Sequence, residues 1–126
     1  MNIPGLTSAF RAGGAITKRR ILTDGASDGA AIQATGATAR LLGVSTDIDT
    51  ASGAIVDAIR TGLAPVEYGG AVDRGDPLTA DASGRAIAAT LPIAANTYII
   101  GFAEVSGVLG DIGSVHVAPA LLAVSA

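Results

Sequence analysis

The chain contains no cysteine and no tryptophan, and aromatic residues make up only 3% of its 126 residues. Without cysteine it can form no disulfide framework, no thiolate nucleophile and no cysteine-ligated zinc site. His116 is the single histidine, which is too little for a His/Cys metal site or for a nucleophile activated by a base and an orienting group. We therefore expect no enzyme, and no metal or other cofactor.

An excess of positive charge is also missing. The sequence has 8 lysines and arginines against 11 aspartates and glutamates, a net charge of −3. A nucleic-acid-binding surface needs the opposite balance, so we expect no nucleic-acid partner. Mean hydropathy is +0.52, but no uninterrupted apolar run reaches the roughly 20 residues of a membrane helix. We expect no membrane partner and no signal peptide.

Helix signals are scarce as well. The 17 glycines are spread along the chain, and no window of about 11 residues keeps a helical period. Short runs of Ala, Val, Ile and Leu alternate instead with turn dipeptides such as Asp24-Gly25 and Asp28-Gly29. Short strands separated by turns every 8–12 residues or so are typical of sandwiches and barrels. The sequence predicts a single all-β domain, a small β-barrel or sandwich.

The two halves of the chain are similar in sequence, residues 13–64 to residues 69–123. The clearest matches are GGAI at 13–16 with GGAV at 69–72, AIQAT at 31–35 with AIAAT at 86–90, and LLGV at 41–44 with IIGF at 99–102. An internal repeat predicts supersecondary units that must pack together to close a core. Chance similarity between Ala- and Gly-rich segments is the alternative. We interpret residues 13–126 as one domain built from two repeated halves.

Residues 1–12 lie outside the repeat. They carry the apolar residues Ile3, Leu6 and Phe10 and end near Arg11. A frayed terminus is one interpretation, and an extended N-terminal arm that reaches a neighbouring subunit is the other. The apolar residues favour the arm, and removal of residues 1–12 is then expected to leave a folded domain.

Lys18, Arg19 and Arg20 form the one basic cluster, inside a strand predicted over residues 15–22. Basic side chains on an edge strand discourage unwanted pairing, which explains the cluster without a ligand. Contact with an acidic partner surface is the alternative. His116 is expected to be a solvent-facing or interface residue of a strand, and Gly75-Asp76-Pro77 a tight turn.

One further pattern consists of turn residues and short strand segments that recur over most of the chain. It consists of Gly70-Ala71-Val72, Gly75-Asp76-Pro77-Leu78-Thr79-Ala80-Asp81, Gly84-Arg85, Ile100-Gly101-Phe102-Ala103, Gly110-Asp111 and Val115-His116-Val117. This pattern resembles the capsid cement, or head decoration, proteins of tailed bacteriophages, most closely over residues 69–117.

The resemblance implies a β-barrel-like structural protein of the virion. Such a protein is expected to be a homotrimer on the outer capsid surface that bridges neighbouring copies of the major capsid protein, partly through an N-terminal arm. The residues expected to contact the capsid or a neighbouring subunit are Ile3, Leu6, Phe10, Arg11, Lys18, Arg19 and Arg20.

Two other functions stay open at this point. A soluble β-barrel carrier or ligand-binding module fits the composition, although Lys18, the sole lysine, lies inside the predicted strand and not at the hairpin tip where lipoyl and biotinyl carriers present theirs. A spike or tail-associated structural module is the third possibility.

Overall fold

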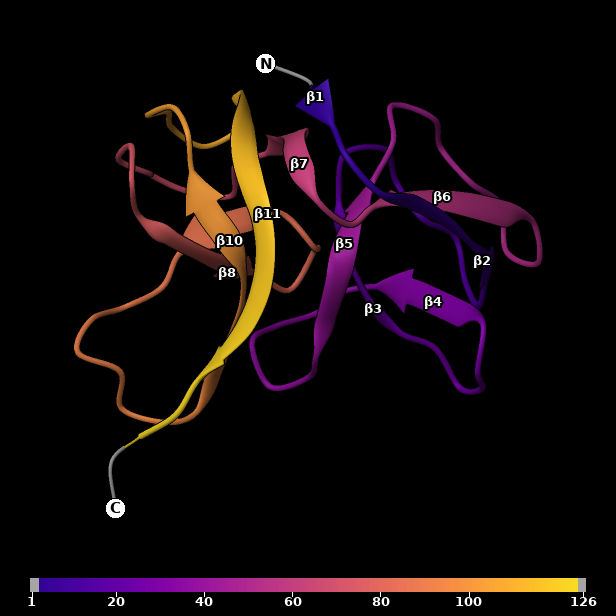
Figure 1. The fold of residues 1–126 in the computed structure, drawn as a ribbon, viewed down its shortest axis with the longest axis horizontal. Coiled ribbons are helices and arrows are strands. Elements are labelled where there is room, and N and C mark those ends of the chain that lie inside the picture. Colours follow the sequence, from indigo (N-terminus) through magenta and orange to yellow (C-terminus); the bar gives the residue numbers. More distant parts are fainter. Residues whose placement is uncertain (1–2, 125–126) are drawn as a thin grey trace.

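The computed structural model describes residues 3–124, and all regular structure within them is β-strand (Figure 1). The strands are β1 (Ile3–Pro4), β2 (Thr7–Ala12), β3 (Ile21–Asp24), β4 (Ala30–Gln33), β5 (Leu41–Ser45), β6 (Ile55–Ile59), β7 (Gly62–Glu67), β8 (Pro77–Ala80), β9 (Ala86–Ala88), β10 (Thr97–Ala103) and β11 (Ile112–Leu122). The predicted all-β fold is confirmed. No helix in this described part of the chain has the length and hydropathy needed to cross a membrane.

The first half of the chain folds into a closed barrel with the strand order β2-β4-β3-β5-β6, which lies on the right in Figure 1. Strand β2 closes the barrel because it pairs with β6 in the antiparallel direction and with β4 in the parallel direction. Closure removes the free strand edges that an open sheet leaves. The second half, together with the N-terminal strand β1, forms the sheet β1-β7-β11-β10-β8-β9, on the left in Figure 1.

The strand pairings of the second half follow the same plan as those of the barrel. Strands β7, β8, β9, β10 and β11 take the places of β2, β3, β4, β5 and β6. An isolated parallel bridge between Tyr68 and Ala86 links the end of β7 to β9, where the parallel pair β2–β4 closes the barrel. The isolated bridge Ile16–Thr50 has its counterpart in Val72–Gly107.

Individual hydrogen bonds recur at the matching positions. The carbonyl of Ala12 accepts the N–H of Gly53 at 2.8 Å, and that of Tyr68 accepts the N–H of Gly110 at 2.9 Å. Both glycines have positive φ, 84° and 89°, a conformation that glycine adopts without strain. The common descent of the two halves stays a prediction, but these pairings define which positions are structurally equivalent.

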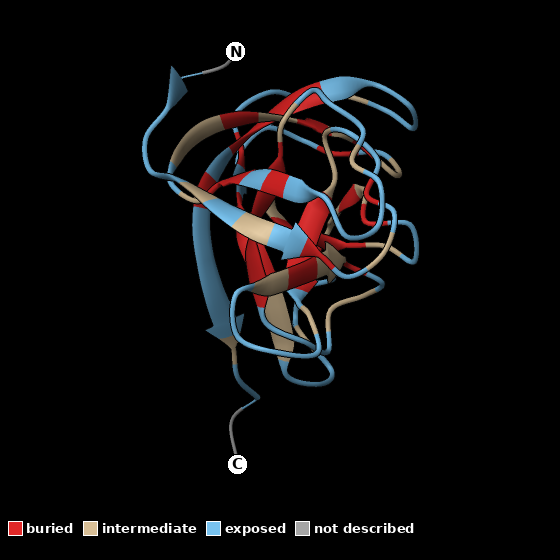
Figure 2. Cartoon of the chain, turned by 90° about the vertical axis from the view of Figure 1, so that its right-hand side faces the viewer, coloured by how far each residue is buried: buried red, intermediate tan, exposed pale blue. Residues whose placement is uncertain are grey.

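The core fills the space between the barrel and the second sheet. Its larger cluster takes residues from both halves, among them Ile21, Val44, Tyr68 and Val115. A smaller cluster around Leu22 lies inside the barrel. In Figure 2 the buried residues gather in the interior, whereas β1 and the C-terminal half of β11 are exposed. Because this cluster contains residues from both halves, the two halves share one hydrophobic core.

Two expected elements differ from the structure. Residues Thr7–Ala12 form β2 of the barrel and not a free arm, because their backbone groups pair with β6 and β4. Removing residues 1–12 would therefore take a strand out of the barrel. The strand expected over residues 15–22 begins only at Ile21, because Lys18 and Arg19 form a turn.

Candidate functional site

The first two residues of the predicted contact set, Ile3 and Leu6, are exposed. Ile3 pairs with Leu63 of β7 and is 60% exposed, and Leu6 is 58% exposed. The N–H of Leu6 donates to Oγ1 of Thr61 at 2.6 Å, and the carbonyl of Leu6 accepts the N–H of Arg60 at 2.7 Å. These bonds hold the N-terminal segment against the β6–β7 turn while both apolar side chains face solvent.

The next two, Phe10 and Arg11, already have partners within the barrel. Phe10 is half-buried against the smaller core cluster, and the guanidinium carbon of Arg60 lies 5.5 Å from its ring centroid. Nη1 of Arg11 donates to the carbonyl of Gly53 at 2.7 Å. A cation over an aromatic face and a side-chain-to-backbone bond both stabilise the barrel, so the fold itself accounts for these two residues.

A row of four apolar residues and one histidine crosses the outer face of the second sheet. The register pairs Ile3 with Leu63, Leu63 with His116, His116 with Phe102, and Phe102 with Pro77. Residues directly opposite one another in a sheet have their side chains on the same face. We call these five residues the outward row.

The outward row is open to solvent for most of its length. Ile3, His116 and Phe102 are exposed, Phe102 by 45%, and Leu63 and Pro77 are half-buried. Exposed apolar side chains that lie side by side on one sheet face are typical of an interaction surface. The sequence analysis singled out Ile3 and expected His116 on a strand surface, but it missed the other three. Their proximity depends on cross-strand register, which no local pattern reveals.

The basic cluster divides into three environments. Lys18 is exposed, and its backbone N–H donates to Oδ1 of Asp49 at 2.9 Å. Arg20 connects the two halves, since its Nη1 donates to the carbonyl of Ser83 at 2.8 Å and its Nη2 lies 3.3 Å from Oε1 of Glu67. Arg20 therefore serves the fold. Lys18 and Arg19 are not explained in this way.

Arg19 lines a pocket of about 390 Å³ at the junction of the N-terminal segment, the barrel and β7. The other lining residues are Pro4, Thr7, Thr46, Asp47, Ile59 and Pro65. Pro65 lies two residues beyond Leu63 on the same face of β7, and Pro4 follows Ile3. The pocket thus adjoins one end of the outward row. Of the predicted contact residues only Arg19 lines it, and the N-terminal segment contributes Pro4 and Thr7 instead.

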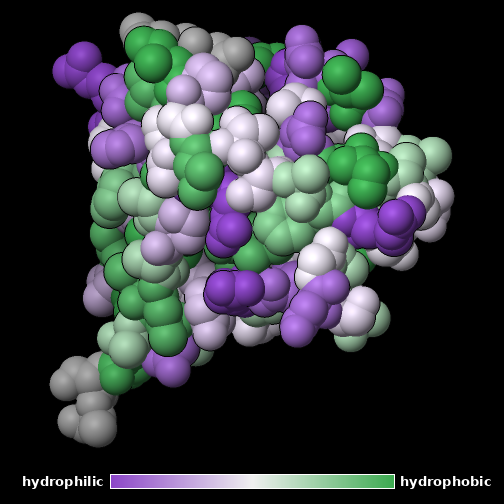
Figure 3. All heavy atoms as spheres, turned by 45° about the vertical axis from the view of Figure 1, so that its right-hand side comes forward, coloured by the Kyte–Doolittle hydropathy of each residue, from purple (hydrophilic) through white to green (hydrophobic). Residues whose placement is uncertain are grey.

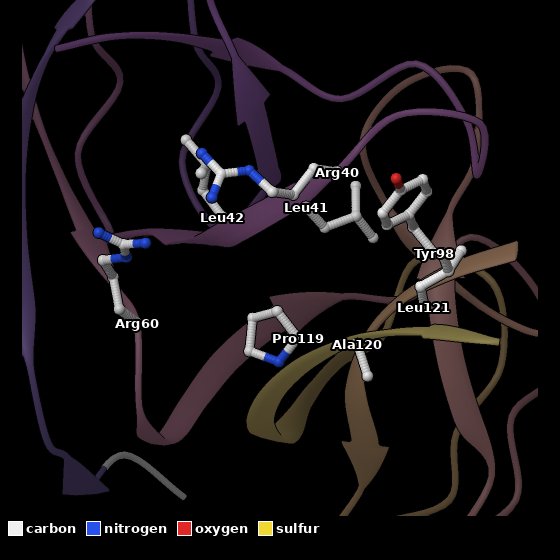
Figure 4. Close-up of a pocket in the computed structure, with 8 residues that line it drawn as sticks. All are labelled: Arg40, Leu41, Leu42, Arg60, Tyr98, Pro119, Ala120 and Leu121. Atoms are coloured by element: carbon white, nitrogen blue, oxygen red, sulfur yellow. The ribbon is translucent and has the colours of Figure 1, made fainter. Parts of the chain in front are cut away.

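A second pocket, of about 280 Å³, lies between β5 and the C-terminal half of β11 (Figure 4). Arg40 and Arg60 lie on one side of it and Pro119, Ala120 and Leu121 on the other. In Figure 3 hydrophobic residues extend along the surface toward the C-terminal end of the described chain. The volume of this pocket lies just below the 300–1,000 Å³ or so found for small-molecule sites, so the pocket by itself gives no support to a ligand-binding module.

The charge of Arg40 at that pocket is largely satisfied within the chain. Its Nε and Nη2 donate to the two carboxylate oxygens of Asp24 at 2.9 and 2.7 Å. The side-chain hydrogen bond from Arg40 lowers the pKa of Asp24 below its ordinary value. Within residues 3–124 no group of three His, Asp or Glu side chains is arranged to hold a metal ion.

Comparison with solved structures finds chains of similar fold. No family model matches the chain, and no curated protein matches it. The fold is similar to the crystal structure of the head fiber gp8.5 N base of bacteriophage phi29, with a TM-score of 0.66 and 19% sequence identity. The likeness covers 90% of this chain and 93% of that chain. At this identity the comparison establishes a shared fold.

Proposed function

We propose that this chain is a structural protein of a phage virion that attaches to the outer surface of the capsid. The observation that carries the proposal is the shared fold, over nearly the whole of both chains, with a protein described as the base of a phage head fiber. The exposed outward row supports the same function, because it offers a mostly apolar surface at which a partner can dock.

The proposed partner is the major capsid protein. Exposed Ile3 and Phe102 would form the apolar centre of the contact, with Leu6 and Lys18 at its margin. Burial of apolar area contributes roughly 25 cal/mol per Å², and an apolar centre with a solvent-accessible polar margin is typical of such interfaces. Binding only the assembled capsid would stabilise it by mass action, with no turnover.

We further propose that the chain acts as a homotrimer that bridges neighbouring capsid subunits. Three linked copies of a modest contact bind far more tightly than one, because the second and third contacts form at a high effective concentration. Native mass spectrometry and equilibrium sedimentation measure the assembly directly. A mass of one chain at micromolar concentration would exclude this part of the proposal.

The docking proposal is tested with phage heads assembled without this chain. The variant combines Ile3→Ser with Phe102→Ser, and the matched control is Ile55→Ser, whose side chain is 56% exposed on barrel strand β6. We expect the double variant to lose about tenfold or more in affinity for heads, from the lost apolar contact, and the control to bind as the wild type does.

Co-sedimentation of labelled protein with heads gives the affinity, and thermal melts show that all three proteins are folded. Wild-type protein that fails to sediment with heads would refute the proposed function. Equal binding by the double variant and the control would instead show that the chain attaches to heads without using the outward row.

A further inference from the structure

Arg19 has an unusual backbone conformation. Its φ is 56°, and among the described residues it is the one non-glycine residue with positive φ. Two backbone hydrogen bonds hold it there. Its N–H donates to the carbonyl of Thr46 at 3.0 Å, and its carbonyl accepts the N–H of Glu67 at 3.1 Å. For a residue with a Cβ this left-handed region is strained, and such strain concentrates at functional positions.

The second half of the chain uses glycine at the equivalent turn. The N–H of Gly75 donates to the carbonyl of Ala103 at 2.8 Å, as Arg19 does to Thr46, and its φ is 92°. A Cβ built on Gly75 meets nothing within 4 Å. The turn therefore needs positive φ, which glycine supplies without strain. There is also room for a side chain at this position, so steric fit alone does not select glycine. The fold does not explain why the first half has an arginine at this turn.

The side chain of Arg19, unlike that of its neighbour Arg20, does not bond the two halves of the chain to each other. It is half-buried in the pocket of about 390 Å³, and no residue between 3 and 124 gives its guanidinium a hydrogen bond or an ion pair. Asp47 also lines the pocket but forms no ion pair with Arg19. A planar guanidinium with free donors is suited to a carboxylate, which it can bind with two parallel hydrogen bonds.

We propose that the Arg19 pocket binds an aspartate or glutamate side chain of the protein on which this chain docks. The proposal rests on the proposed function, since the pocket adjoins the outward row through Pro65 and Pro4. The carboxylate of the partner enters the pocket as the row is covered, and Arg19 fixes the orientation of the contact. Asp47 repels that carboxylate and restricts it to the guanidinium side.

Two substitutions at Arg19 separate binding from backbone strain. Arg19→Ala removes the guanidinium and keeps a Cβ in the left-handed turn, whereas Arg19→Gly removes both. We expect each to weaken binding to heads by about tenfold, the loss of one charge-assisted contact. We also expect Arg19→Gly to melt about 3 °C above Arg19→Ala, because only glycine relieves the strain. Arg74→Ala, at the turn that contains Gly75, is the charge-matched control and should bind within about twofold of the wild type.

A second measurement does not depend on heads. Adding N-acetyl-triglutamate amide to ¹⁵N-labelled protein should shift the backbone amide signals of Arg19 and Thr46 in the wild type but not in Arg19→Ala. In Asp47→Asn the same shifts should saturate at a lower peptide concentration, because a repelling charge is gone.

The outcomes are distinguishable. Wild-type protein that fails to bind heads refutes the proposed function, and the peptide titration then decides on the pocket. Heads that bind wild type and Arg19→Ala equally overturn the Arg19 proposal and leave the proposed function intact. Peptide shifts that are the same in wild type and Arg19→Ala also overturn the Arg19 proposal. Equal melting temperatures for the two Arg19 variants overturn its strain argument.

Discussion

Tyr68 and Gly113 pack against each other inside the second half. This packing can be tested by giving the two positions residues like those at the equivalent positions of the first half. Tyr68 is fully buried, and its ring lies where a Cβ on Gly113 would be placed. At the equivalent positions the barrel has Ala12 and Val56, which pack in the same small cluster. The second half thus places a tyrosine against a glycine, which has no side chain, whereas the barrel places an alanine near a valine.

The magnitudes follow from this packing. A buried aromatic side chain removes about 150–250 Å² from water, and its loss with the resulting cavity costs roughly 3–5 kcal/mol. Tyr68→Ala also removes the hydrogen bond of 2.7 Å from the phenol to the carbonyl of Val105. Gly113→Val in the wild type forces side-chain atoms into the ring and should cost about 3 kcal/mol.

The double variant decides whether the two positions are coupled. In the Tyr68→Ala background the valine at position 113 enters the space that the ring has left. The same Gly113→Val change should therefore stabilise that background by about 1–2 kcal/mol, the transfer of a few methyl groups into the core. The effect of one substitution reverses its sign between the two backgrounds, a coupling of several kcal/mol.

Urea unfolding followed by far-ultraviolet circular dichroism measures all four free energies of unfolding, and it does not depend on the tyrosine that is removed. Unchanged m-values show that the change is in stability and not in the extent of unfolding. If Gly113→Val lowers stability by the same amount in both backgrounds, the reasoning from equivalent positions is refuted.

Two titration predictions follow from the hydrogen-bonding and burial data. Burial raises the pKa of Tyr68 above its ordinary value of about 10, so its stabilising effect is complete below that pH and is lost as pH rises further. Tyr68→Phe should flatten the loss of stability in the alkaline range, and an unchanged pH profile would contradict this. The bond from Arg40 lowers the pKa of Asp24, so that pair stabilises above about pH 4 and loses its effect as the pH falls. Because both side chains are more than half exposed, Asp24→Asn should cost at most about 0.5 kcal/mol at neutral pH and nothing in 1 M salt or so; a larger, salt-independent loss would contradict it.

Local patterns were enough to predict the class of fold. Glycine-bounded runs of Ala, Val, Ile and Leu without a helical period indicated short strands, and the structure has strands at most of those places. The matched segments around Gly13 and Gly69 led to the expectation of two repeated halves. The two halves have equivalent strand pairings, and the repeat itself stays a prediction. These features depend on neighbours in sequence, so the sequence displays them.

Pairing partners across the sheets required the tertiary structure. Residues 7–12 looked like an arm because their barrel neighbours, β4 and β6, come later in the chain. Lys18 to Arg20 looked like part of a strand because the bonds that hold Arg19 in a turn come from Thr46 and Glu67.

The candidate site divides in the same way. Composition determined that the chain is acidic, free of cysteine and poor in histidine. Ile3 and Arg19 could be predicted as contacts because one is an apolar residue near the N-terminus and the other belongs to the basic cluster. Only the folded chain decided that Ile3, His116 and Phe102 share one face, and that the Arg19 side chain has no hydrogen-bond or ion-pair partner among residues 3–124. The physical reason is that register and burial depend on residues far apart in sequence, and these become neighbours only when the two halves close around a common core.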